Sequence, residues 1–224
     1  MANTSAGPGN RKIVIFDLMD TLLVDPVHRT FRTLFGSAAS GEPAALSLYR
    51  TYRDRAAFEL FESGRLTEYE YFRAFYHDHT PPPILQSLPR PQKVKKILLR
   101  EVSLMPGALS LLEELQARRI PVAVASNYSI WYHDILRFCP QMEELCDYLF
   151  FSCELGYRKP DPVFYSRIGQ TLKTEGLEEI FFLDDRQVNI DAATRAGWQA
   201  MRFTSMTGSR QKINAFLAEE SDFV

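Results

Sequence analysis

Four apolar segments of the chain are each followed by polar side chains of kinds that could do chemistry together. In chain order these are Asp17 and Asp20, Ser126 and Asn127, Arg158 and Lys159, and Asp184 and Asp185. Carboxylates placed directly after a buried strand add nothing to a core, but they are typical of a loop at the carboxyl end of a strand in an α/β sheet. For the first stretch taken alone, a turn whose aspartates cap nearby amides is an equal alternative.

The combination of these groups favours phosphate chemistry. Clustered carboxylates repel one another unless a cation joins them, and Mg²⁺ prefers oxygen ligands. A lysine and a hydroxyl facing that cation could hold the oxygens of a phosphate group. If the four loops meet at one crevice, the sequence therefore predicts a site for metal-assisted phosphoryl chemistry.

The elements around these loops predict an α/β fold. Short apolar runs at 12–16, 121–125, 148–152, 180–183 and 199–203 alternate with helical patterns in the second half of the chain. Strands that alternate with helices form parallel sheets with helices on both faces, and all carboxyl ends then lie along one edge. This topology would bring together polar groups that are far apart in the sequence.

Between the first strand and residue 100 the pattern is helical, aromatic and poor in strands. It predicts one amphipathic helix over 46–61, a second that begins with a capping box at Thr67 and Glu70, and a third over 92–101. Aromatic residues at helical spacing could line a pocket but more often form a core, and the arginines could meet an anion or pair with glutamates at the surface. These residues are Tyr49, Tyr52, Tyr69, Phe72 and Phe75, and Arg50, Arg53, Arg55 and Arg65.

Composition and charge limit the partners and the cellular location expected for this protein. The net charge is −2 and no basic block is present, so neither nucleic acid nor an anionic membrane surface is an expected partner. No apolar run is long enough for a membrane span or a signal peptide, and a cytoplasmic location follows as an expectation. Residues 1–10 are small and polar, which predicts a mobile N-terminus, and the three cysteines lack the spacing of a zinc site. His77 and His79 favour a solvated helix end over a metal site.

Four motifs together resemble those of the haloacid dehalogenase superfamily. They are Phe16–Leu22, Ala125–Asn127, Gly156–Pro162 and Leu183–Ala193. The resemblance implies a Rossmann-like core over 11–24 and 104–224, a parallel sheet in the order 5-4-1-2-3, and an inserted helical cap over 25–103.

The same resemblance implies a role for each polar residue. Asp17 would be the nucleophile that forms an aspartyl phosphate. Ser126, with Asn127 beside it, would bind the phosphoryl group, and Lys159 would neutralise charge. Mg²⁺ would be held by Asp17, Asp185 and the main-chain carbonyl of Met19, with Asp184 as a second acidic partner.

Position 19 departs from the pattern of the family's phosphatases. They carry a second aspartate there that protonates the leaving group and activates water, and a thioether cannot transfer protons. Asp20, one residue further on, is a candidate substitute. Relatives without that aspartate include dehalogenases and phosphonatases. The acidic pair Asp184 and Asp185 argues for a retained metal, which dehalogenases do not need. Phosphonatases need a cap lysine that forms a Schiff base, and nothing singles out one of Lys93, Lys95 and Lys96 for that role.

The expected function is a hydrolase, a Mg²⁺-dependent phosphatase of a small phosphorylated metabolite. The alternatives are a phosphate-binding or regulatory protein with little turnover, and a non-phosphatase activity of the dehalogenase or phosphonatase type. The oligomeric state is left open.

Overall fold

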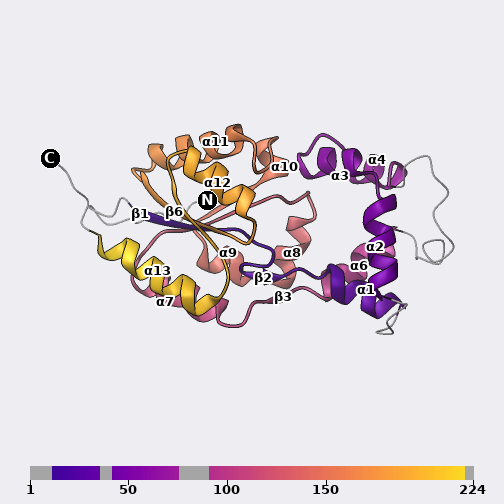
Figure 1. Cartoon of the computed structure of the whole chain (residues 1–224), viewed down its shortest axis with the longest axis horizontal. Helices are drawn as coiled ribbons and strands as arrows, with labels where there is room; N and C mark the ends of the chain where they lie inside the picture. The colour runs from indigo at the N-terminus through magenta and orange to yellow at the C-terminus, as the bar shows by residue number, and fades with distance from the viewer. Residues whose placement is uncertain (1–11, 36–41, 76–90, 220–224) are drawn as a thin grey trace.

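A parallel sheet of apolar strands carries the polar loops at one edge. The computed structural model describes residues 12–35, 42–75 and 91–219. Five of the described strands form the sheet in the order β5-β4-β1-β6-β7 (Figure 1). They are β1 (Lys12–Phe16), β4 (Val122–Ser126), β5 (Tyr148–Phe151), β6 (Glu179–Asp184) and β7 (Gln199–Arg202). Numbered among themselves along the chain and read from β7, they have the order 5-4-1-2-3, which confirms the predicted sheet.

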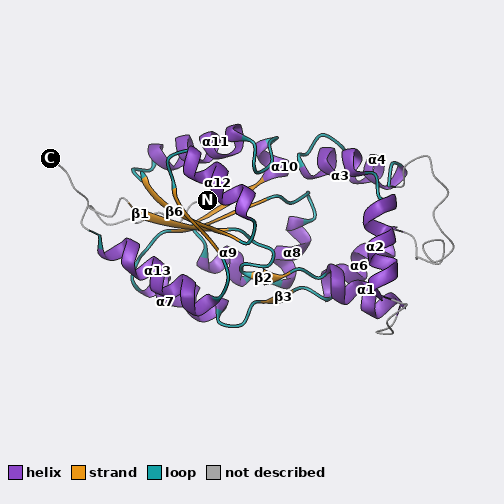
Figure 2. Ribbon diagram, viewed as in Figure 1, coloured by secondary structure: helices purple, strands orange, loops and turns teal. Residues whose placement is uncertain are grey.

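Strand β1 is central, and its side chains alternate between two cores. Val14 and Phe16 belong to one apolar cluster, while Ile13 and Ile15 belong to the other. Helices cover both faces (Figure 2). The first face packs against α7 (Ala108–Ala117), α8 (Tyr132–Phe138), α9 (Gln141–Leu145) and α13 (Met206–Ala218), and the second against α11 (Pro162–Thr174) and α12 (Gln187–Arg195). Burial of β1 on both faces explains its continuous apolar run.

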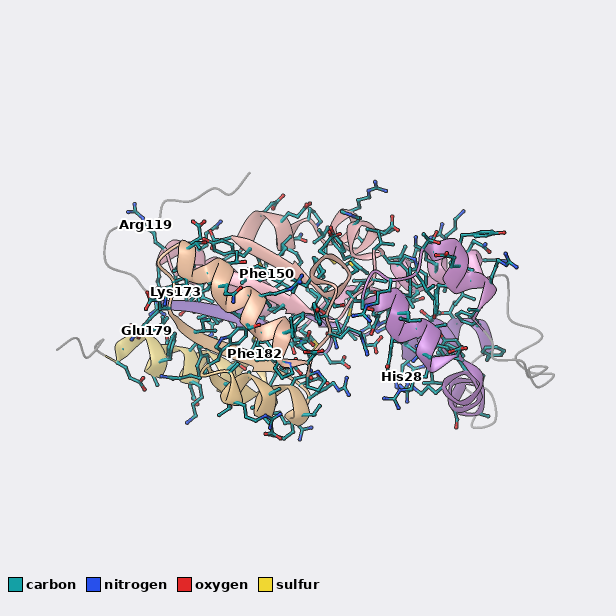
Figure 3. The ribbon with its side chains drawn as sticks, turned by 90° about the horizontal axis from the view of Figure 1, so that it is seen from above. His28, Arg119, Phe150, Lys173, Glu179 and Phe182 are labelled. Atoms are coloured by element: carbon teal, nitrogen blue, oxygen red, sulfur yellow. The ribbon has the colours of Figure 1, made fainter. Side chains whose placement is uncertain are left out.

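A second group of helices lies beside the sheet at one end of the molecule. These are α1 (Val27–Phe35), α2 (Glu42–Tyr52), α3 (Arg55–Glu62), α4 (Glu68–Arg73) and α6 (Pro91–Arg100), which we call the cap helices. Figure 3 shows the same division from above, with Phe150 and Phe182 in the sheet and His28 out on the cap helices. Where the chain leaves and re-enters the sheet part, β2 (Leu23–Val24) pairs antiparallel with β3 (Ser103–Leu104), a connection that the sequence pattern did not predict.

The predicted single helix over 46–61 is wrong, because the chain forms two helices there. α2 ends at Tyr52, and α3 begins at Arg55 with Asp54 as its N-cap. The Asp54 carboxylate accepts a hydrogen bond from the Ala57 amide at 2.8 Å, which satisfies a donor that the start of α3 leaves open. The capping box of Thr67 and Glu70 at the start of α4 is confirmed.

Other expectations concern the rest of the chain. The N-terminal residues 1–10 and the histidines at 77 and 79 lie outside the described residues. Cys139, Cys146 and Cys153 are free cysteines. Among the described helices, none has the length and apolar character needed to cross a bilayer.

Candidate active site

A buried lysine ties the ends of three strands together. Lys159 is only 3% exposed, and its Nζ donates to Asp17 Oδ1 at 2.8 Å, to the Ala125 carbonyl at 2.8 Å and to Asp184 Oδ2 at 2.6 Å. Asp17 follows β1, Ala125 lies in β4, and Asp184 ends β6. Burial lowers the pKa of Lys159, but Asp17 and Asp184 outweigh it and raise the pKa above the ordinary value. The lysine is therefore a fixed positive charge at the centre of the sheet edge.

Asp184 is fully buried and held from several sides. The Asn189 side-chain amide lies 3.0 and 2.9 Å from its two carboxylate oxygens, and the Arg186 main-chain amide donates to Oδ1 at 2.8 Å. With the Lys159 contact, these bonds fix the orientation of the carboxylate. Asp184 therefore positions the lysine that faces Asp17.

Three carboxylates form a cluster that fits a divalent cation. One oxygen from each of Asp17, Asp184 and Asp185 lies within 4.8 Å of the others. Burial, followed by repulsion from Asp17 and Asp184, raises the pKa of Asp185 to about 6. The three carboxylates carry more negative charge than the single positive charge of Lys159 offsets. Their ligand atoms are all oxygens, which Mg²⁺ prefers.

The loop after β1 turns sharply at Asp20. Asp20 has a φ of +54°, its amide donates to the Leu23 carbonyl at 2.6 Å, and its Oδ1 accepts the Asp25 amide at 3.0 Å. Met19 is half-buried and packs against the apolar cluster under β1. Both residues line the cavity described below, so the loop brings a thioether and a displaced carboxylate to the same opening.

Ser126 and Asn127 occupy different places at the end of β4. Ser126 is 2% exposed and lines the cavity. The Asn127 side chain exchanges two hydrogen bonds with the Lys159 main chain, accepting from its amide at 2.7 Å and donating to its carbonyl at 2.9 Å. Asn127 thus holds the loop that carries the lysine.

A cavity of about 310 Å³ opens above Asp17, between the sheet edge and the cap helices. Its floor contains all the predicted site residues except Asp184. Much of the remaining lining is aromatic: Tyr49, Phe58, Phe61 and Tyr71 come from the cap helices, and Tyr128 and Trp131 come from the segment between β4 and α8. Of the aromatic residues singled out from the sequence, Tyr49 lines the cavity, Phe75 is buried in the cap core, and Tyr69 is 69% exposed.

Two charged residues of the cavity wall come from the cap helices. Glu62 accepts from Arg158, whose NH2 lies 2.7 Å and Nε 2.9 Å from Glu62 Oε2. Arg158 directly precedes Lys159 in the chain, so this ion pair joins α3 to the core. The other residue is Arg53, whose guanidinium lies 3.7 Å from the centre of the Phe58 ring.

Sequence patterns did not assign Asn189, Glu62 or Arg53 to the site. Asn189 lies on the first turn of α12, five residues after Asp184. This spacing is the sequence feature from which its contact with Asp184 could have been predicted. Glu62 and Arg53 lie in a segment whose periodicity shows helices but not what they face. Arg55 does pair with Glu59 at 2.9 Å, as a surface arginine was expected to do.

Comparison with known proteins agrees with this geometry. A family model described as haloacid dehalogenase-like hydrolase matches residues 11–197. Flavin mononucleotide hydrolase 1 of Arabidopsis thaliana, a chloroplast protein, is 29% identical over 191 residues, which are 85% of this chain and 71% of that protein.

Two solved structures share the fold. A predicted HAD-like family hydrolase from Porphyromonas gingivalis has a TM-score of 0.67 at 19% identity, covering 93% of this chain and 98% of that one. A HAD family enzyme from Bacteroides thetaiotaomicron, solved in complex with magnesium and inorganic phosphate, has a TM-score of 0.59 at 16% identity over 87% of this chain and 95% of that one. The match over most of its length shows that this chain belongs to the haloacid dehalogenase-like hydrolases.

Proposed function

We propose that this hydrolase is a Mg²⁺-dependent phosphatase that cleaves small phosphate monoesters through an aspartyl phosphate on Asp17. The observation that carries the proposal is the contact of Lys159 with Asp17 inside a cluster of three carboxylates, at the floor of the cavity. The FMN hydrolase relative and the magnesium and phosphate in the Bacteroides enzyme support the same chemistry.

Asp17, Asp185 and the Met19 carbonyl would hold Mg²⁺, with Asp184 beside them. The cation supplies positive charge that offsets the charge of the phosphate. Lys159 stays protonated, lies against Asp17 and adds a second fixed positive charge. Ser126 would donate its hydroxyl to a phosphoryl oxygen. The cap helices would act as a cap domain over residues 25–103 that excludes bulk water from the cavity.

The reaction has two steps at Asp17. A carboxylate oxygen of Asp17 attacks phosphorus, the ester P–O bond breaks, and the leaving alkoxide takes a proton. Water then attacks phosphorus while a base accepts its proton, and the bond to Asp17 breaks to release phosphate. Outside the metal cluster, the carboxylates that line the described cavity are Asp20, Asp25 and Glu62, and Asp20 lies on the same loop as the nucleophile.

Hydrolysis of an activated aryl phosphate, with and without Mg²⁺, tests the proposal, because such a leaving group needs little protonation. Product release and intact protein mass are followed for the natural protein, Met19→Asp and Asp17→Asn. We expect Mg²⁺-dependent product and a phosphorylated protein that Met19→Asp clears faster. Asp17→Asn should show neither product nor added mass.

Met19 supports one second candidate, a phosphate-binding protein with little turnover. In that case phosphate would bind in the presence of Mg²⁺, but neither the natural protein nor Met19→Asp would release product or gain mass. Dehalogenase chemistry needs no metal, so a reaction on 2-haloacids independent of Mg²⁺ would identify it. A phosphonatase would need a cap lysine at the cavity, and among the described cap residues Lys93, Lys95 and Lys96 do not line it.

A further inference from the structure

Arg53 is a cation of the cap that the proposed reaction leaves without a role. It lies between α2 and α3, lines the cavity together with Asp17, and is half-buried. The other buried or half-buried cations of the cavity are engaged at short distances, Lys159 with Asp17 and Asp184 and Arg158 with Glu62. No carboxylate of the described chain lies within ion-pair distance of Arg53.

The guanidinium is held in place by aromatic rings. It lies 3.7 Å from the centre of the Phe58 ring and 5.6 Å from that of Tyr49. Its Nε is buried and has no hydrogen-bond partner among the described residues. A guanidinium presents five donors, so Arg53 retains unused capacity for an acceptor. Glu62 is near enough to feel its charge without forming a contact.

The rest of this wall favours a flat, apolar ligand body. Phe61 and Tyr71 stack with ring centres 4.4 Å apart, and Trp131 meets Phe61 edge-on at 5.4 Å. This packing fixes the shape of the wall, and aromatic walls bind planar rings by stacking and edge contacts. A planar guanidinium can also stack on a ring while its edge donates hydrogen bonds.

We propose that Arg53 determines substrate specificity by binding an acceptor oxygen on a planar ring system carried by the leaving alcohol of the phosphate ester. The Lys159 end of the cavity would take the phosphate, and the Arg53 end would take the ring. This inference rests on the proposed phosphatase function, because it assigns the non-phosphate part of the same substrate. It predicts a preference for ring-bearing phosphate esters over short aliphatic ones.

The test compares FMN, whose flavin ring carries carbonyl oxygens, with glycerol 2-phosphate, which has no ring. Steady-state hydrolysis is measured for the natural protein, Arg53→Ala, Arg53→Lys and Arg55→Ala. Arg55 is the matched control, because it is exposed and pairs only with Glu59 among the described ion pairs. We expect Arg53→Ala to raise KM for FMN roughly tenfold to a hundredfold, with kcat and all constants for glycerol 2-phosphate within about twofold. Arg53→Lys should recover part of the loss.

Binding of FMN, followed by quenching of its fluorescence, separates this inference from the proposed function. If no phosphate ester is hydrolysed but FMN binding still depends on Arg53, the phosphatase proposal fails and the ring site stands. If FMN is hydrolysed and Arg53→Ala leaves its KM and binding unchanged, the inference is overturned and the phosphatase proposal stands. An equal loss for FMN and glycerol 2-phosphate also overturns it, because Arg53 would then serve the phosphate end or the fold.

Discussion

At the scale of single residues, the charge of Lys159 stabilises the fold because it offsets two buried carboxylates. It separates Asp17 and Asp184, which it contacts at 2.8 and 2.6 Å, and removing its charge would leave two buried carboxylates facing each other. Breaking a buried ion pair from one side costs about 3–5 kcal/mol of unfolding free energy. We therefore expect Lys159→Met to unfold at lower urea concentration and Mg²⁺ to restore part of the difference. An unchanged urea midpoint without metal would contradict this account of the cluster.

The shifted pKa of Glu62 makes the free energy of unfolding depend on pH. Burial raises its pKa from 4.5 to about 7, against the opposing effect of Arg158. Between these values the folded protein holds a proton that the unfolded chain has lost, so the free energy of unfolding should fall as pH rises through this window, by about 1–3 kcal/mol from this group. Glu62→Gln should remove that part of the slope in urea titrations at several pH values.

Glu59 serves as the control for Glu62. Its hydrogen bond with Arg55, followed by the charge of Arg158, lowers the pKa of this carboxyl, so its contribution to stability is present above the unfolded pKa and lost in acid. Glu59→Gln should therefore change the slope in the opposite direction. If both substitutions change the slope of stability against pH in the same direction, the account of a pKa raised by burial at Glu62 is wrong.

At the scale of elements, the turn after α3 touches the core at Gly64. It has a φ of +70°, and a β-carbon there would lie 2.2 Å from the Cys153 carbonyl oxygen of helix α10 (Ser152–Leu155). Gly176 has a φ of +78° and open space around it. Gly176→Ala should cost only the left-handed backbone term of about 1–2 kcal/mol, whereas Gly64→Ala should lose about 1–3 kcal/mol more to the clash. Thermal unfolding of both variants measures the difference, and equal losses would refute the close approach.

The two parts of the chain differ in how far sequence could predict them. Asp17, Ser126 and Asp184 were placed correctly at the sheet edge because strand ends in a parallel sheet share one side. Periodicity predicted α4 and α6, but it merged α2 with α3 and gave no prediction of α1. Periodicity also does not say which face of a helix meets another element. For that reason Arg53 could not be assigned to the cavity, and the break before Asp54 was overlooked despite the capping side chain.

At the scale of the whole molecule, the cap helices meet the core on two sides of the cavity. One contact is the Arg158–Glu62 ion pair. The other joins α4, α6 and α8 through Lys95, whose Nζ lies 2.7 Å from Glu68 and 2.9 Å from Asp134. Trp131 Nε1 also donates a hydrogen bond to Glu68, and Trp131 itself lines the cavity. Both contacts therefore link the cap helices to the core beside the cavity.

Loss of the Lys95 contact should loosen the cap helices without disturbing the sheet. Lys95→Gln removes the charge that bridges Glu68 and Asp134, while strands β1, β4 and β6 keep their hydrogen bonds. We expect faster amide hydrogen exchange in α4 and α6 and unchanged exchange in those strands. Lys93→Gln, an exposed position on the same helix, is the control and should leave exchange as it is. If Lys95→Gln speeds exchange in the strands equally, the cap helices and the sheet unfold as one cooperative unit, and the cap cannot open independently of the sheet.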